Sequence, residues 1–311
     1  MLDANTPEAD FLEATADIIR QTGGWVNPQA RVIPSEDGAS AGLGIACPAE
    51  DEAPLLLVPG ECFLPIGEIP WADGPRLELT GPLPDLPPRT VEMLFVQIGL
   101  HNQRNAVARI ASDHPQLAPG LDQALIESVR RFRHRFRVEP PTPTELFWSN
   151  RCFRFTSTEG ITRPMAVPFV DLLNHRDGAG LGSLHGEGFF VTVDHRTGEP
   201  HRDAGECFLD YGRQRDAIGM AIVYGFCDEQ NPRAHSAPMT LEDSALGEIV
   251  IEARGRDRSG SPIAVRGERT ARGIRLTHLT FDRRRGLAAS IASLAETCLL
   301  YTSPSPRDQR G

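Results

Sequence analysis

The stretch FLDYGRQRDAIGMAIVYGFCDEQNP, residues 208–232, decides how this chain is interpreted. The chain has only three tyrosines, and two of them, Tyr211 and Tyr224, lie here, each followed by a glycine. The third, Tyr301, lies in a polar segment near the end of the sequence. Taken alone, Tyr224 is typical of a core tyrosine with a satisfied hydroxyl group, and Tyr211-Gly212 of the end of a strand. Further motifs elsewhere in the chain are needed before a function can be assigned to these two tyrosines.

The bulk composition describes a globular chain of 311 residues with a formal net charge of −10. Such a charge argues against a general nucleic-acid binder or a binder of anionic membranes. No apolar run approaches the roughly 18 residues that a membrane helix needs, and the N-terminus lacks the basic and apolar segments of a signal peptide. We therefore expect a cytoplasmic protein. The cysteines form no C-x-x-C pair, which favours reduced thiols over a disulfide framework or a zinc site; they are Cys47, Cys62, Cys152, Cys207, Cys227 and Cys298.

Hydrophobic periodicity predicts many short strands interrupted by a helical block. Helices are expected at 9–24, 90–111, 121–138, 216–225 and 286–300. Strands are expected within 30–65 and at 153–157, 165–173, 188–195, 206–212, 248–256, 261–267 and 273–281. Residues 66–90 are rich in proline and predict a loop. The pattern is neither alternating βαβ nor a repeat array, so the predicted fold class is mostly β with a helical insertion (α+β).

Two patterns that suggest binding sites have simpler structural explanations. Four histidines lie between residues 175 and 201, but nothing in their spacing places them on one face, and we expect no metal site. The segment SVRRFRHRFRV, residues 128–138, interleaves arginines with phenylalanines. Its apolar residues follow helical spacing, which favours a buried stripe below a basic solvent-exposed face over a nucleic-acid contact.

Three separate segments together resemble the SET-domain methyltransferases, specifically the branch of Rubisco large-subunit methyltransferase and the actin histidine methyltransferase. The first segment, residues 23–49, has Gly42-Leu43-Gly44 at its centre. The second contains Asn150-Arg151 and then VPFVDLLNH, residues 167–175. The third is the stretch 208–232, with Tyr211-Gly212, Tyr224-Gly225-Phe226 and Asn231-Pro232. Each motif is weak alone, but their order and spacing together are specific.

The resemblance implies a SET fold of short curved sheets with a C-terminal pseudoknot, an exception to the rule against knotted chains. The SET domain would span 1–235, with the helical insertion at about 90–138. Residues 236–300 would begin a truncated C-terminal substrate-binding domain, which is helical in this branch. The tail 301–311 is polar, carries two prolines and resembles read-through from a vector, so we expect the natural chain to continue past about residue 297.

The resemblance also implies a function, which is transfer of a methyl group from S-adenosylmethionine to a lysine of another protein. Tyr224 would orient the incoming nitrogen, and Tyr211 would form a wall of the lysine channel. Residues implied in cofactor binding are Ala41, Gly42, Leu43, Gly44, Arg151, Asp171, Asn174, His175 and Phe226. We expect no metal, no nucleic acid and no membrane as partners, and the sequence does not indicate an oligomeric state.

Some residues depart from the pattern of the family and keep other interpretations open. Arg176 follows Asn-His where a small serine is more usual, and Ala41 stands where a charged residue is common. Arg151 could be a surface cation, and Asp171 and His175 could simply pair or cap. Two alternatives to lysine methylation therefore remain, which are histidine N-methylation by the same site and a catalytically silent SET module that binds protein. The chain has no lysine, so it cannot methylate a lysine of its own.

Overall fold

The computed structural model describes most of the first two thirds of the chain and part of the remainder. The described residues are 8–34, 42–47, 54–114, 117, 141–156, 160–176, 179, 182–185, 188–192, 206–211, 217–226, 233–236, 238–252, 267–277 and 279–282. The chain divides into two compact units. The first comprises Met1–Pro119, Glu139–Tyr211 and Ile222–Phe226, and the second comprises Gly120–Val138, Gly212–Ala221 and Cys227–Gly311.

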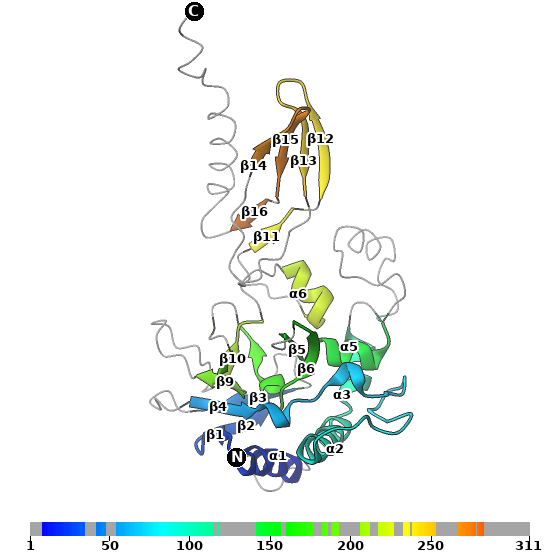
Figure 1. Ribbon diagram of the computed structural model, residues 1–311, viewed down its shortest axis with the longest axis vertical. Coiled ribbons are helices and arrows are strands. Elements are labelled where there is room, and N and C mark those ends of the chain that lie inside the picture. The colour runs from blue at the N-terminus through cyan, green and yellow to red at the C-terminus, as the bar shows by residue number, and fades with distance from the viewer. Residues whose placement is uncertain are drawn as a thin grey trace, which may run out of the picture. The chain divides into compact units, whose positions relative to one another are not determined.

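The helices of the first unit are α1 (Ala9–Gln21), α2 (Pro88–Gln103), α3 (Ala106–Asp113) and α5 (Pro143–Ser149), with 3₁₀ turns at Gly60–Cys62, Ile66–Glu68 and Val170–Leu172. Helices α1 and α2 lie on the side where the chain begins, while α3 and α5 lie beside the strands β5 (Cys152–Thr156) and β6 (Thr162–Ala166) (Figure 1). Proline at the first position of α2 suits a residue whose N–H has no helical partner. Helices α1 and α2 pack side by side, and the ring of Phe11 occupies the space that a side chain at Gly99 would need.

Strands of the first unit form two four-stranded sheets and a hairpin. One sheet has the order β1-β4-β9-β8 and the other β2-β3-β10-β7, while β5 and β6 pair with each other. The bounds are β1 Trp25–Val26, β2 Arg31–Pro34, β3 Leu43–Ala46, β4 Pro54–Pro59, β5 Cys152–Thr156, β6 Thr162–Ala166, β7 Asn174–His175, β8 Ser183–His185, β9 Gly188–Thr192 and β10 Glu206–Leu209. Strand β10 pairs antiparallel with β3 and parallel with β7. Segments far apart in the sequence therefore meet at β10.

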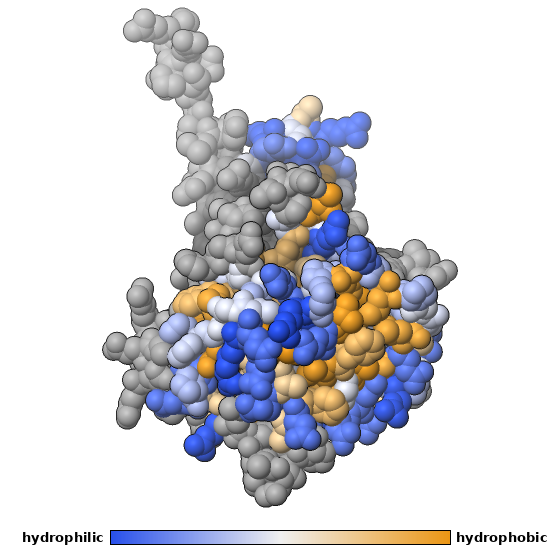
Figure 2. Space-filling model, turned by 60° about the horizontal axis from the view of Figure 1, so that its bottom comes forward, coloured by the Kyte–Doolittle hydropathy of each residue, from blue (hydrophilic) through white to orange (hydrophobic). Residues whose placement is uncertain are grey.

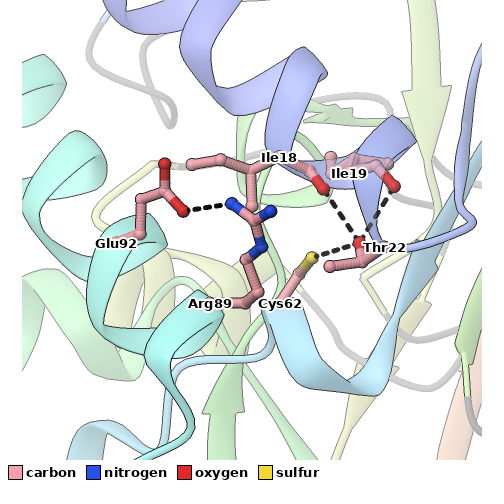
Figure 3. A network of polar contacts seen from close by, with 6 residues as sticks. All are labelled: Ile18, Ile19, Thr22, Cys62, Arg89 and Glu92. Carbon is pink, nitrogen blue, oxygen red and sulfur yellow. Dashed lines mark hydrogen bonds and ion pairs between the residues drawn. The ribbon is translucent and has the colours of Figure 1, made fainter.

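The C-terminus of α1 is fixed by a polar contact with the turn that follows β4 (Figure 3). The hydroxyl group of Thr22 lies 2.9 Å from the carbonyl oxygens of both Ile18 and Ile19, and 3.2 Å from Sγ of Cys62. Burial raises the pKa of the Cys62 thiol, so the sulfur keeps its proton at neutral pH. Gly23 continues the chain with a φ of 81°, a conformation that ends helices.

Apolar and polar side chains are unevenly distributed on the surface of the first unit. Figure 2 shows apolar side chains gathered on the right of the view, beside a polar region in the centre. The exposed large apolar side chains of the described residues are Trp25, Phe95, Ile161, Leu184, Met239 and Leu241. Isolated exposed apolar residues are ordinary in globular proteins. No described helix combines the length and the apolar character needed to cross a membrane.

The second unit contains a four-stranded sheet of order β12-β13-β15-β14 and a separate pair, β11 with β16. The bounds are β11 Arg233–His235, β12 Met239–Asp243, β13 Gly247–Ile251, β14 Gly267–Arg269, β15 Gly273–Leu276 and β16 Thr280–Asp282. Among the described residues of this unit, Ile251, Ile274 and Leu276 form a small buried core, and every residue of β12 is exposed. Helix α6 (Ala217–Tyr224) contains residues assigned to both units.

The fold class predicted from the sequence, mostly β with a helical insertion, is confirmed by these elements. The expected helix 90–111 is two helices, because Asn105 adopts a left-handed conformation with a φ of 50° between α2 and α3. The strand expected at 165–173 is wrong beyond Ala166. Phe169 has a φ of 66°, which turns the chain into the 3₁₀ helix Val170–Leu172.

The helical C-terminal domain implied by the resemblance does not appear between residues 233 and 282, where the described residues form strands. The expected strand 273–281 is divided into β15 and β16. The predicted helices at 121–138 and 286–300, and the motif Asn231-Pro232, lie outside the described residues. The pseudoknot and the identity of the C-terminal domain stay predictions.

Candidate functional site

Strand β10 brings the motif segments of the first unit together. Cys207 lies opposite Ile45 of β3, and Phe208 lies opposite Asn174 of β7. Strand β3 begins directly after Gly42, and β10 is followed by Asp210 and Tyr211. The glycine loop, the Asn-His pair and the first Tyr-Gly segment therefore lie on three neighbouring strands. Ala41 lies outside the described residues.

Asn174 connects all three strands through its side chain. It is fully buried, and its Nδ2 donates hydrogen bonds to the carbonyl oxygen of Leu43 at 3.1 Å and to Oε1 of Glu206 at 2.6 Å. A Cβ at Gly44 would overlap Oε1 of Glu206. In this structure, Gly44 is therefore a glycine because the Glu206 carboxylate needs the space. The expected contact between Asn174 and a cofactor stays a prediction, and both hydrogens of its amide are already used within the protein.

Gly42 is held by an arginine from the helical block. Its φ is 80°, in the left-handed region that favours glycine. Its carbonyl oxygen accepts a hydrogen bond from Nη2 of Arg104 at 3.2 Å. A Cβ at this position would lie 3.0 Å from Nη1 of Arg109 and 3.1 Å from Nη2 of Arg104, so two guanidinium groups converge on the loop.

Four rings form an aromatic cluster, which comprises His175, Tyr211, Tyr224 and Phe226. The ring centroids of Tyr211 and Tyr224 are 4.6 Å apart, and those of His175 and Tyr211 are 5.3 Å apart. Phe226 is 6.0 Å from His175 and 6.2 Å from Tyr224. The two Tyr-Gly segments singled out in the sequence therefore place their tyrosines in direct contact. All four residues keep an intermediate fraction of their surface exposed.

Hydrogen bonds fix the rings of this cluster. The backbone N–H of Tyr211 donates to Nδ1 of His175 at 3.1 Å, which places the proton of the neutral imidazole on Nε2. The hydroxyl group of Tyr211 donates to the carbonyl oxygen of Leu173 at 2.5 Å. Burial, assisted by the nearby Tyr224, raises the pKa of Tyr211, so its phenol stays neutral. The hydroxyl group of Tyr224 makes a longer bond, 3.4 Å, to the carbonyl oxygen of Tyr211.

A buried charged group lies in the same unit and comprises Arg151, Asp171 and His101. Nε2 of His101 lies 3.1 Å from Oδ2 of Asp171, and each side chain is only 3% exposed. The two atoms lie at hydrogen-bond distance but do not form a regular hydrogen bond, so the pair is a close polar contact. Burial lowers the pKa of His101 and the Asp171 carboxylate opposes the shift, which leaves His101 neutral at pH 7.

Arg151 is a buried residue and not the surface cation that one interpretation of the sequence allowed. It is 4% exposed, its Nη1 donates to the carbonyl oxygen of Phe147 at 3.3 Å, and its guanidinium lies 4.2 Å from the centroid of the Phe147 ring. Burial lowers the pKa of Arg151, and Asp171 is the strongest opposing charge. The same burial raises the pKa of the Cys152 thiol to about 12, so Cys152 is an unreactive neutral thiol.

Arg176, the departure from the family pattern, has a defined position. Its guanidinium lies 3.8 Å from the centroid of the Phe208 ring, on the strand opposite Asn174. A cation over an aromatic face is worth about 0.5–2 kcal/mol, depending on solvent exposure. The extra bulk of Arg176 is therefore accommodated against Phe208, at the edge of the sheet that carries the motifs.

Sequence reasoning missed several residues that belong to this site. Glu206 is a buried carboxylate within the apolar strand ECFL, and a charged residue at such a position was a usable signal. Gln97 and His101 interrupt the buried face of α2, which was a second signal. His114 is 2% exposed and lies 2.8 Å from where a Cβ of Gly225 would be, so it backs the turn after Tyr224.

The arrangement offers binding groups and no metal centre. No group of three or more histidine, cysteine or acidic side chains that could hold a metal ion occurs among the described residues. Asp171 keeps one buried oxygen, Oδ1, without a hydrogen-bond partner among those residues. Aromatic rings beside buried groups of opposite charge suit a ligand that carries its own charges, including a cation.

Comparison with known proteins gives matches only among solved structures. No family model matches the chain, and no curated protein matches it. The SET domain of LSMT bound to lysine and AdoHcy is 13% identical with a TM-score of 0.40, covering 76% of this chain and 61% of that one. Rubisco LSMT bound to AdoMet is 13% identical with a TM-score of 0.41, covering 75% of this chain and 59% of that one.

A third solved structure, Rubisco LSMT bound to sinefungin and monomethyllysine, is 15% identical to this chain with a TM-score of 0.38. The match covers 77% of this chain and 61% of the chain in that structure. The chain thus spans about three fifths of the length of these solved structures.

Proposed function

We propose that this chain is an S-adenosylmethionine-dependent protein N-methyltransferase that acts on a lysine side chain of another protein. The observation that carries the proposal is the convergence of the motif segments on β10. The Gly42-Leu43-Gly44 segment, the Asn174-His175 pair and Tyr211 lie on or just beside the adjacent strands β3, β7 and β10, and the ring of Tyr224 contacts that of Tyr211. The segments that resemble the SET pattern in the sequence are thus neighbours in the fold.

The residues present fit S-adenosylmethionine as a ligand. Its amino acid portion carries an ammonium and a carboxylate, for which the buried Asp171, with its unpartnered Oδ1, and the buried Arg151 offer opposite charges. The aromatic cluster offers ring faces to a sulfonium, an attraction of about 0.5–2 kcal/mol. When bound, the cofactor supplies a methyl group on a positively charged sulfur.

The chain's own residues then have to orient the acceptor nitrogen and exclude water. With a reference pKa near 10.4, a free lysine amine is neutral at pH 7 only at a cost of roughly 4–5 kcal/mol. An apolar channel lowers this cost, because desolvation disfavours the ammonium form. In this proposal, the rings of Tyr211, Tyr224 and Phe226 form one wall of such a channel. The hydroxyl group of Tyr224 makes a long bond of 3.4 Å to the carbonyl oxygen of Tyr211, and in this proposal it turns toward the incoming nitrogen.

The test is a comparison of cofactor binding and methyl transfer in the wild type and in Tyr224→Phe. Binding is measured by calorimetric titration with S-adenosylhomocysteine, and transfer with labelled S-adenosylmethionine on an array of peptides that each contain one lysine. We expect the rate of transfer to fall by at least about 100-fold in Tyr224→Phe, as for loss of an orienting contact at the reacting atoms. The dissociation constant should change less than threefold, because the ring remains.

Two controls define the outcome. Tyr211→Phe loses the bond to the Leu173 carbonyl, so we expect it to weaken both binding and transfer. An array in which arginine replaces each lysine should stay unlabelled, and mass spectrometry of the labelled peptides separates lysine from histidine products. Label on the chain itself cannot be methyl-lysine, because the chain has no lysine. An unchanged transfer rate in Tyr224→Phe would remove Tyr224 from the reaction.

A silent module that binds protein is the second candidate, and one observation favours it. The amide hydrogens of Asn174 are bound by Leu43 and Glu206, so this side chain already has a structural role without any cofactor. A folded chain that does not bind S-adenosylhomocysteine would support this candidate over the methyltransferase. Saturable binding with one ligand per chain would exclude it as the whole function.

A further inference from the structure

The junction of α2 and α3 is fixed unusually well for a surface connection. We call residues His101–Asn105 the α2–α3 elbow. Asn102 holds both backbone groups of Leu77, accepting from its N–H at 2.8 Å and donating to its carbonyl oxygen at 2.9 Å. Asn105 then adopts its left-handed conformation, which sets the direction of α3. Side chains on this elbow therefore start from a rigid base.

Arg104 of the elbow reaches the glycine loop. Its Nη1 pairs with Oε1 of Glu8 at 3.2 Å, and its Nη2 donates to the carbonyl oxygen of Gly42 at 3.2 Å. The side chains of Arg104 and Glu8 are 23% and 11% exposed, which makes this the partly buried kind of ion pair that fixes geometry. One guanidinium therefore joins the start of α1, the end of α2 and the glycine loop.

His101 of the elbow reaches the opposite side of the site. Its contact with Asp171 lies on the 3₁₀ helix Val170–Leu172, and its ring packs edge-on against Phe147 at a centroid distance of 4.8 Å. Leu173, whose carbonyl oxygen accepts a hydrogen bond from the hydroxyl group of Tyr211, follows that helix directly. The contact thus fixes the turn that leads into the Asn174-His175 pair.

We propose that the α2–α3 elbow positions both walls of the cofactor site, with Arg104 holding the glycine loop and His101 holding the turn before Asn174. The helical block thereby sets the affinity for the cofactor, although neither residue touches the reacting atoms. This inference rests on the proposed function. Arg104 and His101 are positioning residues in this scheme.

The experiment compares Arg104→Ala, Arg104→Lys and the control Arg20→Ala in the full chain. Arg20 also forms ion pairs, with Glu13 and Asp17, but on the exposed face of α1. For S-adenosylhomocysteine we expect a dissociation constant about tenfold higher in Arg104→Ala, the loss typical of charge-assisted hydrogen bonds. Arg104→Lys should recover part of the affinity, and Arg20→Ala should match the wild type within twofold. Titrations are made well below the melting temperature of each variant, so that a loss of stability alone does not change the measured affinity.

A second readout needs no ligand and is hydrogen–deuterium exchange of the segment 42–47. Arg104→Ala should speed exchange there several-fold, while Arg20→Ala should not. For the other wall, His101→Asn keeps a polar donor and should weaken binding less than His101→Leu, which leaves Asp171 without its partner. Unchanged affinity and unchanged exchange in Arg104→Ala would overturn the inference. A folded wild type that does not bind S-adenosylhomocysteine would instead overturn the proposed function. Faster exchange of 42–47 in Arg104→Ala would in that case show only that the elbow stabilises the glycine loop.

Discussion

The sheet β2-β3-β10-β7 of the first unit and the sheet β12-β13-β15-β14 of the second are held by different means. The first joins segments from residue 31 to residue 209, has a fully buried strand in β10, and is joined through the polar side chains of Asn174 and Glu206. The second joins strands between residues 239 and 276, has a fully exposed strand in β12, and is held by three buried apolar residues.

The difference shows where specificity resides in this molecule. Apolar packing tolerates substitutions of similar volume, whereas a buried amide and a buried carboxylate accept one arrangement only, since an unpaired buried polar group is costly. The first sheet is therefore the one that can hold motif residues in fixed relative positions. The second sheet, in its described residues, packs on the small apolar core of Ile251, Ile274 and Leu276.

The largest effect should come from Asn174→Ala in the first sheet. The change removes both hydrogen bonds of Nδ2 and leaves the Glu206 carboxylate buried without this donor. We expect a loss of about 3–5 kcal/mol in the free energy of unfolding of the first unit. Chemical denaturation, monitored by hydrogen exchange in β3 and β10, measures this loss in the free energy of unfolding. Glu206→Gln is the matched control and should cost less than about 1.5 kcal/mol, because an amide oxygen still accepts the bond. Equal losses in both variants would show that packing, not the polar link, holds this sheet.

A smaller effect is expected from Ile274→Ala in the second sheet. Ile274 is 4% exposed, and truncating it removes part of a core of three buried residues. The expected loss is about 2 kcal/mol, at the low end for such changes because the small core can collapse around the gap. Leu241→Ala, at a side chain 49% exposed, should change stability by less than about 0.5 kcal/mol. Exchange protection of β13 and β15 provides the measurement, and a loss for Leu241→Ala as large as that for Ile274→Ala would mean that β12 is covered.

The pH dependence of stability should also separate the two units. Burial lowers the pKa of both His101 and His114, which belong to the first unit. Below the unfolded value near 6.5 the unfolded chain takes up protons that the folded chain resists. Stability is therefore fully present above about pH 6.5 and falls as the pH drops toward the folded pKa values.

The free energy of unfolding should fall with decreasing pH by up to about 1.4 kcal/mol per pH unit for each histidine. Urea midpoints at pH 7.5, 6.5 and 5.5 would measure it, with His101→Asn expected to remove about half of the slope. The exchange protection factors in β12–β15, which are corrected for the intrinsic pH dependence of exchange, should stay unchanged over this range, since no described histidine of the second unit is buried. A pH-independent midpoint would mean that both histidines take up protons in the folded chain at the same pH as in the unfolded chain.

Much of the first unit could be predicted from local patterns. The apolar spacing of 9–24 predicted α1, the short apolar runs predicted β2, β3 and β4, and Gly225 marked the end of α6. Prediction failed where long-range packing overrides local preference. The run MAVPFVDLL has the composition of a strand, yet Phe169 turns it into a 3₁₀ helix whose residues are buried on all sides. Such a turn is stabilised by contacts that no local window contains.

The candidate site shows the same division. Tyr211, Tyr224, Phe226, Asn174 and His175 were predicted as site residues from the resemblance of their motifs, in order and spacing, to the SET pattern. Their partners were not, since Glu206, Arg104 and His101 act through contacts with residues distant in the chain. The sequence by itself determined the class of fold and the pair of tyrosines at its centre. Only the tertiary structure decided that Gly44 makes room for a carboxylate, that Arg151 is buried and that Arg104 and His101 contact Gly42 and Asp171. Those outcomes depend on which side chains meet across the sheet, and hydrogen bonds between distant segments leave no periodicity in the sequence.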